Sequence, residues 1–260
     1  MILKALTDNL EQFCPPSFAE SWDNVGLLVG RSDKEVQTVY LALDATSEAI
    51  AAAADKGAEL LLTHHPLLHD GLKRVSDDHF VGRRVAALLR RDMCLYAMHT
   101  NFDVMGMADA AADELNLTQR RVLEVTYEDE LATEGLGRVG TLPEHMTLQE
   151  CAAMVRDAFR IPHVRFYGDP QAPIVTAAIM PGSGKSEIDL AAKEGADVII
   201  TGDITHHVGL DAVEKGIAVI DAGHYGVEKL FIPYMKEYLA REFPELTVYT
   251  APEKEPFTEV

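Results

Sequence analysis

Five residues with metal-binding side chains follow short apolar runs of this sequence, or lie four residues after a histidine that does so. They are His64, His65, Asp103, His224 and Glu228. Imidazole nitrogens combined with carboxylate oxygens suit zinc, iron, manganese, cobalt or nickel better than calcium or magnesium, which prefer oxygen ligands alone. The residue types and their positions therefore predict a site for divalent transition metals.

The number of these ligands indicates two metal ions. Three histidines and two carboxylates are too many for one catalytic zinc, which keeps an open coordination position. They fit two ions that share a bridging carboxylate, and the remaining positive charge would favour an anionic substrate group. A helix beginning at His224 would present it and Glu228 on one face. The competing interpretation is a histidine pair that serves only the core or the surface.

His99 is predicted to be a catalytic residue. It stands four residues before Asp103, as His224 stands four residues before Glu228. It would support the site or carry a proton, and a structural role fits the sequence equally well. Asp44 ends another apolar run and could contact the same site.

Other conspicuous residues receive plainer interpretations. His206 and His207 are expected on a loop, as polar lining. Trp22, the one tryptophan of the chain, is predicted to anchor the core or an interface. The turn 182–186 resembles a phosphate-binding loop, but Ile179 occupies the position where the Walker pattern requires glycine.

Apolar runs alternate with helical segments along most of the chain, which predicts α/β structure with mostly parallel sheets flanked by helices. Strands are expected at 27–29, 39–43, 59–62, 94–98, 137–142, 164–167, 175–180, 197–200 and 217–220. Helices are expected at 1–13, 47–56, 80–91, 109–115, 147–159, 187–194, 210–215 and 224–242. Ser47 is the expected cap of its helix, and the acidic, glycine-containing segment 127–137 is predicted to be a linker.

The two halves of the chain resemble each other. Segments 46–63 and 185–201 both run through a helix, a Gly-Ala pair, an acidic residue and an apolar strand ending in threonine. His64 and His65 follow the first strand, and His206 and His207 follow the second after a short insertion. This repeat predicts a first α/β lobe at 1–125, with 225–260 packing on it, and a second related lobe at 126–224. Polar sites form at the carboxyl ends of such strands.

Composition and charge exclude several classes of function. The net charge of −19 argues against binding to nucleic acid or to an anionic membrane surface. The three cysteines, odd in number and far apart, form no disulfide framework and fit a reducing cytoplasm. No apolar run approaches the roughly 20 residues that a membrane span requires.

Seven motifs together resemble the type 2 GTP cyclohydrolase I family, also called Nif-three-like proteins. They are SWDNVGLLVG (21–30), LALDAT (41–46), LLTHHPLL (61–68), HTNFDV (99–104), GLGRVGTLP (135–143), ITGD (200–203) and DAGHYGVEK (221–229). The resemblance covers nearly the whole chain and points to the short form without an inserted middle domain. It implies a Nif-three-like fold and a toroidal homohexamer. It assigns His65 and Asp103 to one metal, His64 and His224 to the other, and Glu228 to both.

The activity implied by this resemblance is opening of the guanine imidazole ring of GTP with release of formate. A fold and a metal centre do not fix the substrate. Two alternatives therefore stay open: a non-catalytic hexameric scaffold that binds metal or a protein partner, and a metal-dependent phosphoesterase.

Overall fold

The computed structural model describes residues 1–258, which divide into two compact units. Unit 1 comprises Met1–Phe102 and Phe231–Lys254, and unit 2 comprises Asp103–Leu230 and the C-terminal segment from Glu255. The division at 102–103 differs from the expected boundary at 125, because the strand Thr118–Glu128 pairs within the sheet of unit 2. Positions 259 and 260, the end of the expected segment 225–260, lie outside the described residues.

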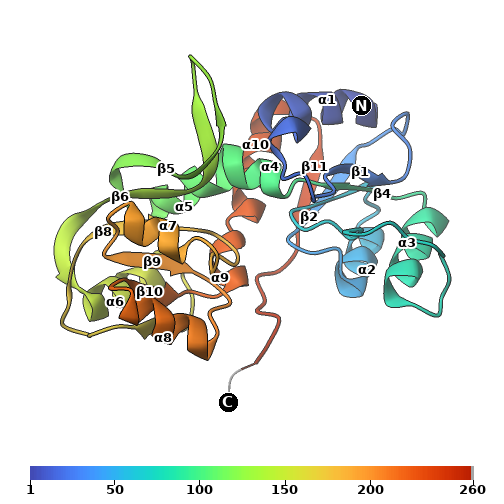
Figure 1. Cartoon of the computed structure of the whole chain (residues 1–260). Coiled ribbons are helices and arrows are strands. Elements are labelled where there is room, and N and C mark those ends of the chain that lie inside the picture. The colour runs from blue at the N-terminus through green and yellow to red at the C-terminus, as the bar shows by residue number, and fades with distance from the viewer. Residues whose placement is uncertain (259–260) are drawn as a thin grey trace. The chain divides into compact units, whose positions relative to one another are not determined.

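Unit 1 contains one five-stranded sheet with the strand order β1-β4-β3-β2-β11. Its strands are β1 (Gly26–Val29), β2 (Thr38–Ala42), β3 (Leu60–Thr63), β4 (Cys94–Ala97) and β11 (Thr247–Thr250). Its helices are α1 (Leu3–Phe13), a 3-10 turn (Pro16–Phe18), α2 (Ser47–Asp55), α3 (Phe80–Arg90), α4 (Thr100–Phe102) and α10 (Phe231–Glu242). Only β1 runs antiparallel to its neighbour within the sheet, so β2, β3 and β4 end at the same edge (Figure 1).

Unit 2 contains a six-stranded sheet with the order β5-β6-β8-β9-β10-β7. Its strands are β5 (Thr118–Glu128), β6 (Thr133–Thr147), β7 (Arg165–Tyr167), β8 (Pro173–Ile179), β9 (Val198–Thr201) and β10 (Ala218–Asp221). Its helices are a π-helical turn (Asp103–Met107), α5 (Ala108–Glu114), α6 (Leu148–Ala158), α7 (Ile188–Lys193), α8 (His206–Glu214) and α9 (His224–Glu228). The strands β8, β9 and β10 are parallel, so their carboxyl ends also meet at one edge.

The predicted duplication is confirmed by the strand order. In unit 1, β1, β4, β3 and β2 lie side by side, and in unit 2 the corresponding order is β7, β10, β9 and β8. In both sets the first strand in sequence runs antiparallel on the outer edge, and the other three are parallel. The α/β fold class with two related lobes is therefore confirmed. Each unit has its own hydrophobic core, built on the fully buried strands β3 and β9.

The predicted linker at 127–137 is wrong, because this segment forms the end of a long hairpin. β5 and β6 pair antiparallel from Thr118 opposite Thr141 to Glu128 opposite Thr133. At the turn, Asp129 accepts hydrogen bonds from the backbone N–H groups of Leu131 and Ala132 at 2.7 and 2.9 Å. Strand pairing uses backbone groups, so a polar and exposed sequence can still form a ladder.

The predicted single helix at 224–242 is also wrong, since it is divided into α9 and α10. The break lies at residues 229–230. Pro233 lacks the N–H group that would continue the helical hydrogen bonds across this point, which explains the interruption. Smaller differences concern two helix starts: Thr46, not Ser47, caps α2, and α8 begins at His206, which was expected on a loop.

None of the helices within residues 1–258 is both long enough and apolar enough to cross a bilayer.

Candidate metal centre

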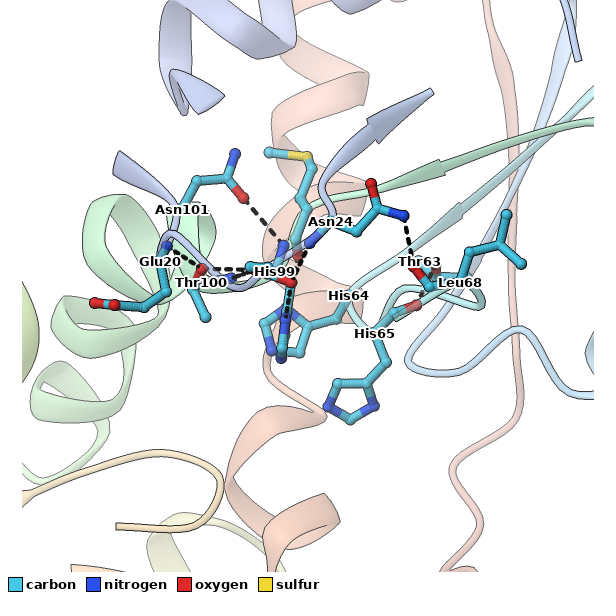
Figure 2. A network of polar contacts seen from close by, with 11 residues as sticks. Glu20, Asn24, Thr63, His64, His65, Leu68, His99, Thr100 and Asn101 are labelled. Carbon is cyan, nitrogen blue, oxygen red and sulfur yellow. Dashed lines mark hydrogen bonds and ion pairs between the residues drawn. The ribbon is translucent and has the colours of Figure 1, made fainter. Parts of the chain in front are cut away.

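Three histidines of unit 1 converge at the carboxyl edge of its sheet. His64 and His65 directly follow β3, and His99 follows the neighbouring parallel strand β4. One ring nitrogen of each lies within 4.8 Å of those of the other two. His64 is completely buried, whereas His65 and His99 are half-buried. Figure 2 shows the three imidazoles grouped below the end of β4.

Each of these imidazoles is held by a hydrogen bond at Nδ1. His64 Nδ1 lies 2.8 Å from the carbonyl oxygen of Met98, and His65 Nδ1 lies 2.8 Å from a carboxylate oxygen of Asp44. A carbonyl oxygen and an ionised carboxylate only accept hydrogen bonds, so Nδ1 is the donor in both contacts. Metal-binding histidines are oriented in this way, by an acceptor on the nitrogen that does not bind the metal.

His99 is held in the same manner by Asp23, 2.9 Å from its Nδ1. The Asp23 side chain has no exposed surface, yet it also accepts from the N–H and the hydroxyl of Thr100 at 3.0 and 2.6 Å. Burial by itself raises the pKa of Asp23, but the hydrogen bonds from His99 and Thr100 outweigh it and hold the pKa far below its ordinary value. Asp23 is therefore an ionised carboxylate that fixes the orientation of His99.

Unit 2 places His224 and Glu228 one turn apart on α9, as the spacing predicted. His224 Nε2 lies 2.8 Å from Glu228 Oε2, and His224 Nδ1 lies 2.9 Å from Asp203. Glu228 is buried and closely covered, because a Cβ atom at Gly182 would lie 2.4 Å from its Oε1. Gly182 also has a φ of +74°, so glycine is required there for two separate reasons.

These donor sets fit a divalent metal. Two ligand atoms that each bind one ion at about 2.1 Å lie roughly 3 Å apart when they are neighbours in its coordination shell. The 2.8 Å contact between His224 and Glu228 is an ion pair that brings a nitrogen and an oxygen ligand atom together. The Nδ1 contacts of His65 and His224 to carboxylates are of the kind that support metal-binding imidazoles.

The remaining candidates are found as follows. Asp103 is half-buried at the first position of the π-helical turn of unit 2. His206 and His207 are exposed at the start of α8. Trp22 is 64% exposed, so the expectation of a core anchor is wrong. Asp44 does contact the site, through His65.

Sequence reasoning missed Asp23 and Asp203, the carboxylates that orient His99 and His224. A signal was available for Asp203, because it lies two residues after β9, as His65 lies two residues after β3. Asp23 lies in the motif at 21–30 and comes 76 positions before its histidine, so no local pattern connects the two.

The chain therefore belongs to a class of two-lobed α/β proteins, and it carries histidine groups that could hold a metal ion at the carboxyl ends of its strands. The sequence profile of the Duf34/NIF3 (NGG1p interacting factor 3) family matches residues 1–256. The chain belongs to this family, as its motifs predicted.

Relatives and a solved structure agree with this assignment. A protein of Clostridium perfringens named GTP cyclohydrolase 1 type 2 homolog is 36% identical over 230 residues, which cover 88% of this chain and 87% of the relative. A protein of the same name from Streptomyces coelicolor is 39% identical, with 84% and 79% of the two chains covered. The crystal structure of Staphylococcus aureus protein SA1388 has a TM-score of 0.89 at 30% identity, covering 100% of this chain and 99% of that one.

Proposed function

We propose that this chain binds two divalent transition-metal ions and hydrolyses a purine nucleotide, opening the imidazole ring of GTP with release of formate. The ligands are His64, His65, Asp103, His224 and Glu228. The proposal is supported by membership of the family and by relatives named as homologues of GTP cyclohydrolase 1 type 2.

One observation carries the metal part of the proposal. Three imidazole nitrogens of unit 1 lie within 4.8 Å of one another. The Nδ1 atoms of those rings face a carbonyl or a carboxylate, which is the orienting contact that metal-binding histidines usually have. Metal-ligating histidines almost always donate their other ring N–H to a carboxylate, a carbonyl or water, and these three rings share that arrangement.

In the family pattern, His65 and Asp103 would hold one ion, His64 and His224 would hold the other, and Glu228 would be a ligand of both. When bound, paired divalent ions lower the pKa of water toward neutrality and stabilise developing negative charge. The same positive charge gives an acidic protein a local attraction for an anionic nucleotide.

His99 is the proton carrier in this proposal. Its Nδ1 donates to Asp23, so Nε2 is the atom that accepts and returns a proton. The ionised carboxylate of Asp23 stabilises the imidazolium that forms when Nε2 is protonated, and it prevents the ring from turning. His99 would therefore influence turnover more strongly than metal content.

The family resemblance further suggests a cytoplasmic, toroidal homohexamer. Sedimentation equilibrium tests the assembly directly, since six copies of a 28.5 kDa chain are expected to move as one species. A monomer or dimer at micromolar concentration would contradict this part of the proposal.

The activity is tested with protein loaded separately with zinc, iron, manganese, cobalt or nickel. Metal content is measured by mass spectrometry, and formate, phosphate and ring-opened product are measured after incubation with GTP. We expect two ions per chain and formate release that is abolished by His65→Ala. His145→Ala, which changes an exposed histidine elsewhere in unit 2, is the matched control and should behave as wild type.

Other outcomes identify the rival functions. Two firmly bound ions with no turnover of nucleotides, cyclic amides or phosphoesters would favour a non-catalytic scaffold. Phosphate release without formate would favour a phosphoesterase. Formate release that is unchanged in His65→Ala would contradict the assigned metal centre.

A further inference from the structure

Trp22 is an exposed indole beside the candidate catalytic histidine. Its side chain belongs to the single tryptophan of the chain, and the residue is 64% exposed. Its ring centroid lies 6.0 Å from that of His99, with the planes at 75°. This edge-to-face contact fixes one edge of the indole.

Hydrogen bonds hold the chain segment on both sides of Trp22. Before it, Glu20 donates its backbone N–H to Thr100 Oγ1 at 2.8 Å, and the N–H of Asp23 donates to the carbonyl of Glu20 at 2.9 Å. After it, the buried Asp23 carboxylate accepts hydrogen bonds from His99 and Thr100. The side-chain amide of Asn24 donates to the carbonyl of Leu68 (Figure 2).

These hydrogen bonds on both sides of Trp22 distinguish it from an ordinary exposed apolar residue. A loose loop could fold its indole away from water, which would be favourable because apolar surface would be removed from solvent. Here, the same hydrogen bonds that orient His99 also position the residue next to it. The backbone that carries the exposed indole is therefore fixed beside the histidine cluster of unit 1, and the indole contacts His99.

We propose that Trp22 is the stacking platform for the purine base of the substrate, a proposal that rests on the function proposed above. An indole offers a flat, polarisable surface that stacks on any base. His99 lies in edge contact with the indole, and the exposed His69 lies on His99 in turn, with their ring centroids 6.3 Å apart. Planar stacking combined with nearby hydrogen-bonding groups suits a heterocyclic base better than an aliphatic or purely anionic ligand.

The single tryptophan makes the test direct, because all indole fluorescence of the chain comes from this position. Zinc-loaded full-length protein is titrated with GTP, guanosine and inorganic tripolyphosphate, and zinc is chosen because it has no redox chemistry. We expect saturable quenching by GTP and by guanosine, and none by tripolyphosphate. Absence of quenching by the two base-containing ligands would overturn the proposal.

Affinity is then compared by calorimetry. Trp22→Ala should weaken GTP binding by about 5- to 150-fold, the range expected for losing one aromatic–base stack. Trp22→Phe should retain most of the affinity, because phenylalanine still offers a flat ring. Phe80→Ala removes an exposed aromatic ring on α3 of the same unit and should leave GTP binding unchanged. Zinc content should be the same in all four proteins.

The results separate this proposal from the proposed function. Quenching by guanosine in a protein that releases no formate would support the platform and contradict the hydrolase. Formate release by Trp22→Ala with unaltered KM would support the hydrolase and overturn the platform. A changed oligomeric state with unaltered GTP affinity would assign Trp22 to contacts between copies of the chain, and would also overturn the proposal.

Discussion

Replacing Asp23 by asparagine tests the network that orients His99. The substitution keeps the shape of the side chain but replaces one acceptor oxygen by an NH2 donor. In the structure, Oδ1 accepts from His99 Nδ1 and from the backbone N–H of Asn24 at 2.9 and 2.7 Å. Oδ2 accepts from the N–H and the hydroxyl of Thr100 at 3.0 and 2.6 Å. An amide can satisfy only one of these pairs.

The expected loss of stability comes from the two hydrogen-bond donors that would face the NH2 group of Asn instead of a carboxylate oxygen. If the amide nitrogen faces Thr100, the backbone N–H of Thr100 loses its acceptor, and its hydroxyl must rotate to accept. Hydrogen bonds to a charged group contribute about 1.5–3 kcal/mol each, and an unsatisfied buried donor costs about 1–3 kcal/mol. Because the Asp23 side chain has no exposed surface, water cannot replace the lost partner. We therefore expect Asp23→Asn to lower the free energy of unfolding by about 2–4 kcal/mol.

The pH dependence of this loss has a definite sign. The folded-state pKa of Asp23 lies well below its ordinary value of 3.8. Its stabilisation is therefore complete above the unfolded-state pKa and is lost as the pH falls through the lowered folded-state pKa. The difference in unfolding free energy between wild type and Asp23→Asn should be complete at pH 7. It should be smaller by about 1 kcal/mol at pH 3, because pH 3 lies slightly less than one unit below the ordinary pKa of 3.8, and one unit corresponds to about 1.4 kcal/mol.

Urea unfolding of metal-free protein at both pH values measures these differences. Asp33→Asn is the matched control, because Asp33 pairs with Arg31 on the surface with 79% of its side chain exposed. That change should cost less than about 1 kcal/mol. An unfolding free energy of Asp23→Asn within 1 kcal/mol of wild type at pH 7 would refute the interpretation of Asp23 as a charged anchor.

Three further predictions concern metal binding and thiol reactivity. Asp44→Asn and Asp203→Asn each remove the carboxylate that orients a histidine of the proposed metal centre, and should weaken metal affinity by about 10- to 100-fold in competition with a chromogenic chelator. Gly182→Ala places a Cβ atom against Glu228 and should lower metal content. Gly195→Ala has a similar positive φ but open space around it, so it should bind metal normally, and equal losses in both variants would contradict the contact with Glu228. Burial raises the pKa of Cys151 to about 12, so iodoacetamide at pH 8 should modify it only after unfolding, and rapid labelling of folded protein would disprove its burial.

The parts of the fold that sequence could predict are those determined by apolar patterning. β3 and β9 are continuous apolar runs buried on both faces, and such runs are typical of central parallel strands. Residues immediately after these strands must lie at the carboxyl edge of the sheet. The placement of His64 and His65 therefore needed no knowledge of long-range contacts.

The parts that sequence could not predict depend on backbone pairing or on distant partners. The β5–β6 hairpin is largely polar on its exposed side, so its register carries little hydrophobic signal. Asp23 reaches His99 over 76 positions, and Asp203 reaches His224 over 21. A carboxylate in a loop looks the same in sequence whether it is solvated or buried against a histidine.

The duplication also explains why matching the repeats by residue type is misleading. Counting from the threonine that ends each strand, His64 corresponds to Gly202 and His65 corresponds to Asp203. A Cβ atom at Gly202 would lie 2.4 Å from the backbone nitrogen of His224, so unit 2 has no room for a side chain where unit 1 has an imidazole. Asp203 instead anchors His224, as Asp44 anchors His65. Because the loop after β10 lies so close, unit 2 cannot have a histidine pair after β9. It has instead one oriented histidine, His224, paired with Glu228.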